Sequence, residues 1–213
     1  MLIILDPKRV SVGTAIRDPI YHYGNGKVLD QIIDDFDAIG GINAGGFIDE
    51  SGAGTGWPPD GITYSDGVCF NPNAAGGVCG LDENGIMYVG YYEYSDTEAL
   101  GIKEAVSFGP ILIAGGEMVD KNSLERGINP RTAIGQREDG AIIMMVVDGR
   151  QAYSIGISYA DCADILYDYG CVNAINMDGG NSTCMFYKGE LVNHPSNPAG
   201  GTRYLPDEWI IKK

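Results

Sequence analysis

Residues 176–183 carry the strongest sign of chemistry in this sequence. An apolar run over 171–177 ends at the carboxylate of Asp178, and the pair Gly179-Gly180 follows at once. Such a run predicts a buried strand, and a glycine turn after a strand lets the backbone come close to a ligand. A second interpretation stays open, in which Asp178 only opens a tight turn, because Asp-Gly is common turn chemistry.

Several other segments place polar side chains at the ends of apolar runs. They are Asn43 after Ile42, the pair Arg131-Thr132, the triplet Asp148-Gly149-Arg150, the stretch 193–196 and Arg203. Each signal is weak alone, and Asp148-Gly149 is equally typical of a plain turn. Polar residues at the ends of several strands build a pocket on a rigid sheet. We therefore expect these residues to meet, with the Arg131 guanidinium and the Asp178 carboxylate facing one cavity.

The elements that must position these residues are mostly strands and turns. Apolar runs lie on both sides of Asp66-Gly67, Asn84-Gly85, Asp139-Gly140 and Lys188-Gly189, which predicts four hairpins, and residues 1–5 predict a first strand. Helical periodicity predicts two main helices, over 28–39 with Gly40-Gly41 as its stop and over 158–169. A capping box that starts at Ser95 predicts one short helix over 95–104. The pattern favours an α+β fold with mixed, largely antiparallel sheets built from hairpins, in a single domain over 1–213.

Charge and composition exclude several classes of protein. With 14 Lys and Arg against 29 Asp and Glu, the formal charge is −15, so extended nucleic-acid binding is not expected. No apolar run approaches the roughly 18 residues that a membrane span needs. The apolar residues 1–5 are too short for a signal peptide, so no signal peptide is expected in this chain. Five cysteines without Cys-x-x-Cys spacing favour free thiols, with a Cys69–Cys79 bridge as the alternative.

Familiar catalytic motifs are missing. Gly26-Lys27 is followed by Val28, so there is no phosphate-binding Walker loop, and no Gly-x-Ser-x-Gly elbow occurs. The two histidines, His22 and His194, are too few for a zinc hydrolase site and are expected to be surface or structural residues.

Six ordered blocks resemble the phosphodiester glycosidase family, and the match covers nearly the whole chain. The blocks are Ile42-Asn43-x-Gly45-Gly46-Phe47, Ser107-Phe108-Gly109-Pro110, Arg131-Thr132-Ala133-Ile134-Gly135, Asp148-Gly149-Arg150, Asp178-Gly179-Gly180-x-Ser182, and Asn193-x-Pro195-Ser196 with Arg203. The sequence departs from the family pattern at Asn181, Thr183 and His194. These departures put the identity of the substrate in doubt more than the activity.

The resemblance implies a glycoside hydrolase that cleaves the C–O bond of sugar-1-phosphodiesters, for example an α-N-acetylglucosaminyl phosphodiester. Its leaving group departs as a stable phosphomonoester anion, so the usual general acid is scarcely needed. Arg131 is then the first candidate for the phosphate contact and Arg203 the second, because a guanidinium binds phosphate through two parallel hydrogen bonds. Asp178 would stabilise the oxocarbenium-like transition state or act as nucleophile or base. Asp148 would orient an arginine or serve as a second carboxylate.

The smaller polar residues are expected to line the same pocket. Asn43 completes the catalytic set, and the residues expected to bind sugar hydroxyls or phosphate oxygens are Thr132, Asn176, Gly179, Gly180 and Ser182. We expect no metal ligand set and no required cofactor, although a bound Ca²⁺ stays open. For Arg131, a structural salt bridge to Asp148 or Asp178 is the alternative role.

Two other functions stay open from the sequence. A non-catalytic phosphoglycan-binding module would use the same polar residues with Trp57, Tyr91 and Tyr92. A phosphodiesterase would cleave the P–O bond instead. The expected partner is a phosphate-linked carbohydrate, as in an exopolysaccharide, and the family suggests a cell-surface, extracellular or phage-particle location. Oligomeric state is not predicted.

Overall fold

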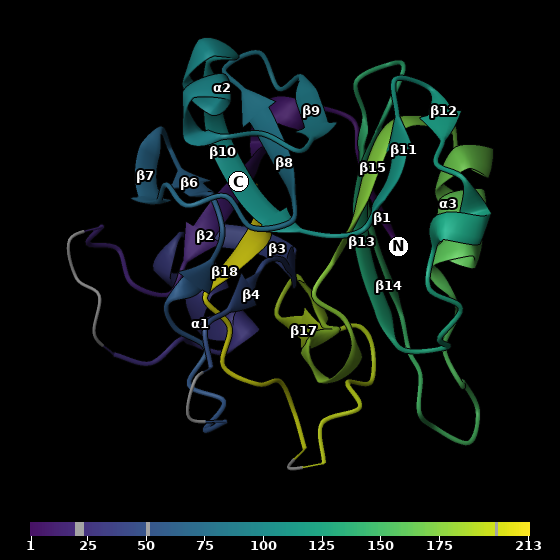
Figure 1. Ribbon diagram of the computed structural model, residues 1–213. Coiled ribbons are helices and arrows are strands. Elements are labelled where there is room, and N and C mark those ends of the chain that lie inside the picture. Colours follow the sequence, from purple (N-terminus) through teal and green to yellow (C-terminus); the bar gives the residue numbers. More distant parts are fainter. Residues whose placement is uncertain (20–23, 50–51, 199) are drawn as a thin grey trace.

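Three β-sheets surround a shared apolar centre in the part of the chain that the structure describes (Figure 1). The structure is a computed structural model that describes residues 1–19, 24–49, 52–198 and 200–213. Every strand pairing within these residues is antiparallel. The predicted α+β fold with largely antiparallel sheets in a single domain is confirmed.

The sheet that we call sheet A holds the strand leading to Asp178. Its strands, in spatial order, are β1 (Leu2–Ile4), β14 (Ile142–Val147), β13 (Arg131–Arg137), β15 (Cys171–Met177), β11 (Ile111–Ala114) and β12 (Glu117–Met118). Helix α3 (Tyr159–Asp168) covers its outer face (Figure 1), where Cys162, Ala163 and Leu166 are buried. Ser158 caps this helix in the predicted capping box with Asp161.

Sheet B and sheet C pack against the inner face of sheet A. Sheet B contains, in order, β17 (Glu190–Leu191), β16 (Met185–Tyr187), β3 (Ala38–Asn43), β18 (Asp207–Lys212) and β2 (Val10–Thr14). Sheet C contains β7 (Val68–Asn71), β6 (Thr63–Ser65), β10 (Ile102–Phe108), β8 (Gly77–Asp82) and β9 (Met87–Gly90). The largest apolar cluster joins all three, with Ile134 of sheet A, Trp209 of sheet B and Val106 of sheet C. Sheet A therefore buries apolar side chains on both faces, against α3 on one side and against sheets B and C on the other, which holds it between them.

The remaining elements are short. Helix α1 (Leu29–Asp35) packs on sheet B, helix α2 (Tyr94–Ala99) lies beside sheet C, and a two-stranded ribbon pairs β4 (Gly46–Phe47) with β5 (Pro59–Asp60). Single 3₁₀ turns occupy Pro7–Arg9, Lys121–Ser123 and Gly180–Ser182. The four predicted hairpins and the first strand are all found.

Two predicted helix boundaries are wrong. Helix α1 ends at Asp35, and Ile39 already belongs to β3. The pair Gly40-Gly41 serves the strand instead of stopping a helix, because a Cβ at Gly41 would lie 2.5 Å from the Trp209 carbonyl oxygen. Helix α2 is capped by Glu93 with Asp96 and ends at Ala99, so 102–104 is strand β10.

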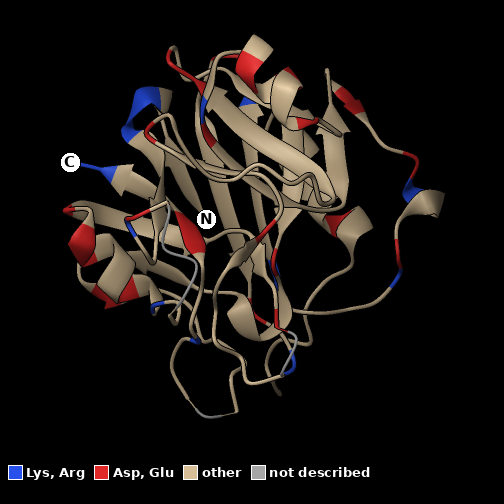
Figure 2. Cartoon of the chain, turned by 60° about the vertical axis from the view of Figure 1, so that its left-hand side comes forward, with Lys and Arg blue, Asp and Glu red and all other residues tan. Residues whose placement is uncertain are grey.

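The surface matches the predicted charge. Figure 2 shows Lys and Arg scattered along the ribbon among the more numerous Asp and Glu. All five cysteines are free thiols, as predicted, and Cys69 and Cys79 are not bridged. No helix in the described part of the chain is long and apolar enough to cross a membrane.

Candidate active site

Asp178 lies where sheets A and B meet. Strand β15 carries it to the sheet edge, and the backbone is then held by β3 and the residue after it. The Asp178 amide donates to the Ala44 carbonyl oxygen at 2.9 Å, and the Asn43 side chain donates to the Asp178 carbonyl oxygen at 2.6 Å. Two hydrogen bonds to its main chain therefore fix the position of Asp178 without using its carboxylate.

Asn43 and Thr132 lock the same junction from inside. The Asn43 carboxamide oxygen accepts from the Thr132 hydroxyl at 2.7 Å and from the Cys184 amide at 3.0 Å. Both residues have 0% exposure. The structure brings them close to Asp178, as predicted, and in this geometry they position the strand ends.

The electrostatic environment of Asp178 is that of a partly desolvated carboxylate. Burial raises its pKa above the ordinary value, while Ser182, the Arg203 charge and the Gly179 amide oppose the shift. Asp178 keeps partial exposure at the surface. A buried carboxylate with an open side and a raised pKa is a common property of reactive groups.

Arg203 is the cation of this site. Its guanidinium lies over the Phe47 ring at 4.7 Å from the centroid, and its charge acts on Asp178. Among the described residues it makes no hydrogen bond or ion pair with a side chain. Its donors are therefore free to bind an anion such as phosphate.

The glycine turn after Asp178 is required by close packing. A Cβ at Gly179 would lie 2.9 Å from the Pro130 carbonyl oxygen, and Gly180 has a φ of +59°. The Gly179 amide favours the ionised form of Asp178, whereas the Gly180 amide donates to the Pro130 carbonyl oxygen at 3.0 Å. Of the two amides predicted to bind substrate, only that of Gly179 faces the carboxylate.

Arg131 is not placed as expected. Its guanidinium donates to the carbonyl oxygens of Gly127 at 2.6 Å and Ile157 at 3.2 Å, and it lies over the Tyr159 ring at 3.6 Å from the centroid. Tyr159 and Ile157 belong to the apolar cluster under α3. Arg131 therefore faces α3, on the side of sheet A opposite to Thr132, because adjacent residues of a strand point to opposite faces. Among the described residues, the Arg131 guanidinium makes no ion pair with Asp148 or Asp178, and its contacts lie on the α3 side of the sheet instead of in a cavity shared with Asp178.

We expect Arg131→Ala to lower the free energy of unfolding by about 2–4 kcal/mol. The variant removes charged donors from two carbonyl oxygens and a cation stacked on Tyr159. Urea unfolding measures the change. Arg137→Ala is the matched control, because Arg137 pairs with Asp139 at the surface and is expected to cost about 1 kcal/mol or less. An Arg131→Ala variant that is fully stable but no longer binds phosphate would instead support the phosphate contact.

Asp148 organises the loop that begins at Asn193. Its carboxylate accepts from the Asn193 side chain at 3.0 Å and from the His194 amide at 3.0 Å, and the His194 ring lies 3.6 Å away. The side chain of His194 is 79% exposed, as expected for a surface histidine, and His22 lies outside the described residues. Asp148 thus holds the loop that leads towards Arg203.

The two other predicted binding residues are largely enclosed. Asn176 has 0% exposure, and its side-chain amide donates to the carbonyl oxygens of Gly109 at 2.9 Å and Met177 at 2.6 Å. Ser182 has 1% exposure and lies close enough to Asp178 to moderate its pKa. Asn176 therefore connects β15 to the segment after β10, and Ser182 adjusts the carboxylate.

Asp207, which the sequence interpretation did not assign to the site, lies here together with Arg150 of the triplet 148–150. Asp207, with 0% exposure, accepts from the Gly45 amide at 2.7 Å, and burial raises its pKa to about 7, with the Asp178 charge adding to the shift. Arg150 donates to Asn181 at 3.0 Å and Asn129 at 2.9 Å beside the glycine turn. The sequence did contain a sign of this site, because the acidic pair Asp207-Glu208 directly precedes the apolar run 209–211. The buried carboxylate of Asp207 lies close enough to Asp178 for the Asp178 charge to raise its pKa.

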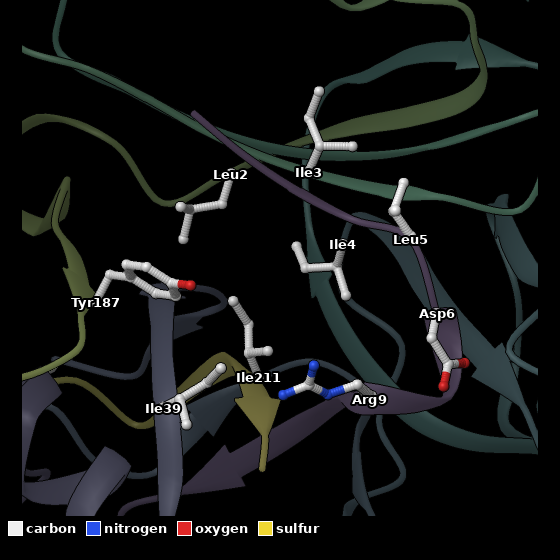
Figure 3. A pocket seen from close by; sticks show the side chains of 9 residues that line it. All are labelled: Leu2, Ile3, Ile4, Leu5, Asp6, Arg9, Ile39, Tyr187 and Ile211. Carbon is white, nitrogen blue, oxygen red and sulfur yellow. The ribbon is translucent and has the colours of Figure 1, made fainter.

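A separate pocket of about 310 Å³ has different chemistry. Figure 3 shows Leu2, Ile4, Ile39, Tyr187 and Ile211 around it, at the ends of β3 and β18 far from Asn43 and Asp207. The Arg9 guanidinium at its rim donates two hydrogen bonds to the Lys212 carbonyl oxygen. Within the described residues, no group of three or more His, Cys, Asp and Glu side chains is placed to hold a metal. The possible Ca²⁺ stays a prediction.

Fold and site together define an α+β protein of antiparallel sheets with a carboxylate pair and a free arginine at one end of the strands. The model of the phosphodiester glycosidase family matches residues 36–212. The chain therefore belongs to the phosphodiester glycosidase family.

Curated relatives are much longer than this chain. It is 30% identical over 149 residues to the SPbeta prophage-derived uncharacterized protein YomE of Bacillus subtilis (strain 168), a match that covers 64% of this chain and 23% of that protein. It is 31% identical over 121 residues to the N-acetylglucosamine-1-phosphodiester alpha-N-acetylglucosaminidase of Bos taurus, covering 57% of this chain and 20% of that enzyme. The chain thus spans less than a quarter of these relatives.

Solved structures share the fold. The catalytic domain of the zebrafish N-acetylglucosamine-1-phosphodiester alpha-N-acetylglucosaminidase, auto-inhibited by its pro-peptide, matches with a TM-score of 0.80 and 23% identity, covering 97% of this chain and 74% of that one. A hypothetical protein from Synechocystis matches with a TM-score of 0.74 and 16% identity, covering 97% and 58%. At these identities the likeness concerns the fold.

Proposed function

We propose that this protein is a glycoside hydrolase that cleaves the C–O bond of sugar-1-phosphodiesters, such as an α-N-acetylglucosaminyl phosphodiester. The single observation that carries the proposal is the Asp178 carboxylate, partly desolvated beside the free guanidinium of Arg203, in a chain of this family. The carboxylate can stabilise a positive charge that develops at the anomeric carbon, and the guanidinium can bind a phosphate.

The chemistry balances with water as the only co-reactant. The bond between C1 of the sugar and the phosphodiester oxygen breaks, and its electron pair leaves with the phosphomonoester. Water supplies the new oxygen at C1, and its proton passes to a carboxylate or to solvent. Because the phosphomonoester is a stable anion, the site needs a cation near the leaving group more than it needs an acid.

The residues of this chain divide the work as follows. Asp178 stabilises the transition state or acts as nucleophile or base, and Arg203 binds the phosphate. Asn43 and Thr132 hold the strand ends, and the Gly179 amide orients the carboxylate. Rigid strand ends are a suitable support, because small displacements of reacting groups cost large factors in rate.

Hydrolysis in ¹⁸O-labelled water tests the bond that is cleaved. We expect the phosphomonoester product to contain no ¹⁸O, because water attacks carbon. Phosphate oxygens are the better readout, since the anomeric hydroxyl exchanges with water on its own. Label in the phosphate would instead establish a phosphodiesterase. A control incubation of the finished phosphomonoester with protein in labelled water excludes later exchange.

Release of reducing sugar distinguishes a hydrolase from a binding module. A folded protein that binds sugar-1-phosphodiesters but releases no reducing sugar from a broad panel of them would contradict hydrolysis. The polymer in which such a linkage occurs, including an exopolysaccharide, stays a prediction.

A further inference from the structure

A second pocket, of about 280 Å³, lies beside the candidate active site and has an aromatic and glycine lining. Its members include Gly46, Gly76, Gly77 and Gly109, with Phe108, Tyr91 and Asp60 around them. The volume is slightly below the roughly 300–1,000 Å³ usual for small-molecule sites. One sugar ring fits this space better than an oligosaccharide.

Two hydrogen bonds connect the lining of the pocket, or the residue next to it, to the elements that carry Asp207 and Asp178. Gly45 precedes the lining residue Gly46, and its amide donates to Asp207 at 2.7 Å. The carbonyl oxygen of Gly109 accepts from Asn176 at 2.9 Å, two residues before Asp178. The segments that line the pocket are therefore bonded to Asp207 and to the strand that ends beside Asp178.

The lining chemistry selects a neutral carbohydrate and not a phosphate. Asp60 is the one charged residue of the lining, and no Lys or Arg belongs to it among the described residues. An isolated carboxylate repels an anion but accepts hydrogen bonds from sugar hydroxyls. Tyr91 is 76% exposed and Phe108 is partly exposed, so both residues can offer an aromatic face to a pyranose.

The lining glycines leave space in the pocket because they have no side chains. Phe108 packs so closely that its ring carbon would lie 3.2 Å from a Cβ at Gly46. At Gly109 the nearest atom to such a Cβ, apart from the chain neighbours Phe108 and Pro110, is the Gly77 nitrogen at 4.0 Å, an ordinary contact. Gly109 is thus a position where the pocket can be filled without disturbing its walls.

We infer that this pocket holds the neutral pyranose ring of the substrate, while the phosphate is directed towards Arg203. Arg203 lies over Phe47, the residue next to Gly46, so ring and phosphate would occupy neighbouring positions. The assignment rests on the proposed function for the identity of the substrate. It adds the orientation of the substrate and names Tyr91, Phe108 and Asp60 as residues that determine sugar specificity.

Binding of neutral methyl α-pyranosides, which lack phosphate, tests the assignment by saturation-transfer NMR. We expect at least one sugar of a panel of glucoside, galactoside, mannoside and N-acetylglucosaminide to bind the wild type. Tyr91→Ala should weaken that binding about tenfold or more, Tyr91→Phe should keep it, and Gly109→Val should remove it. Tyr167→Ala is the matched control, since this tyrosine is 47% exposed on α3 and should have no effect. Binding of inorganic phosphate should be unchanged in the Tyr91 and Gly109 variants.

Two results would overturn the assignment. The first is a wild type that binds none of these sugars, and the second is sugar binding unchanged in both Tyr91→Ala and Gly109→Val. Hydrolysis of a sugar-1-phosphodiester with an unchanged KM in both variants would keep the proposed function and discard the pocket. Sugar binding through Tyr91 without any hydrolysis would keep the pocket and discard the proposed function.

Discussion

Asp178→Asn is expected to lower kcat for hydrolysis of a sugar-1-phosphodiester by about 10²–10⁴-fold, the contribution usual for a positioned acid or base. The amide has the shape of the carboxylate but neither its charge nor its basicity. The protein should stay folded, because the hydrogen bonds that hold Asp178 to Asn43 and Ala44 use its backbone. Burial disfavours the charged form, so the neutral side chain should not reduce the free energy of unfolding. Initial rates and urea unfolding measure both effects.

A matched control separates this effect from a change of net charge. Asp168→Asn removes one exposed carboxylate at the end of α3, away from the site, and should leave the rate unchanged. Binding of substrate by Asp178→Asn should persist, since Arg203 keeps its free guanidinium. A rate within a few-fold of wild type in Asp178→Asn would remove this carboxylate from the chemistry.

The hairpins of this fold could be predicted because their turns are local. Asn84-Gly85 and Asp139-Gly140 supply the backbone conformations that tight turns need, and the apolar runs beside them pair as expected. The end of α1 could not be predicted in the same way. Gly40-Gly41 looks like a helix stop, yet it is needed where β3 passes against Trp209 and Phe186. Only the neighbouring strands, which are distant in sequence, reveal that requirement.

The same distinction explains the site. The sequence analysis predicted that Arg131 and Thr132 lie in one pocket, because both stand at one end of the same apolar run. In a strand, however, neighbours point to opposite faces, so only one of them can lie beside Asp178. Thr132 is bonded to Asn43 on the inner face, and Arg131 stacks on Tyr159 under α3. Which of the two faces inward depends on the packing of α3, and the local sequence does not contain that information.

Asp207, the acid near Asp178, could not be predicted from the sequence. It is the first residue of β18, and a charged residue at the start of a strand is usually exposed at the surface. Its burial arises only because β18 lies between β2 and β3 in the middle of sheet B. A carboxylate kept in such a place, at a cost in stability, is a candidate for function.

Asp207→Asn is expected to flatten the dependence of stability on pH. Burial raises the folded-state pKa of Asp207 to about 7 from an ordinary 3.8, so between these values the folded protein binds more protons than the unfolded chain. The contribution of Asp207 is therefore fully present below pH 3.8 and is lost as the pH rises through 7. At 1.36 kcal/mol per pH unit, the loss is about 4 kcal/mol. Asparagine stays neutral, so the variant should lack this loss.

Urea unfolding of wild type and variant at intervals from pH 4 to 8 measures the difference, with Asp34→Asn, exposed on α1, as the control. Asp178, Glu104 and Glu208 also have raised pKa values through burial, so some decline should remain in the variant. Parallel curves for wild type and Asp207→Asn would contradict the buried charge. Because the Asp178 charge adds to the rise in the pKa of Asp207, Asp178→Asn should lower that pKa and move the loss of stability to lower pH. Loss of stability at a lower pH in Asp178→Asn would establish that the two carboxylates interact, whereas an unchanged pH dependence would show that burial alone raises the pKa of Asp207.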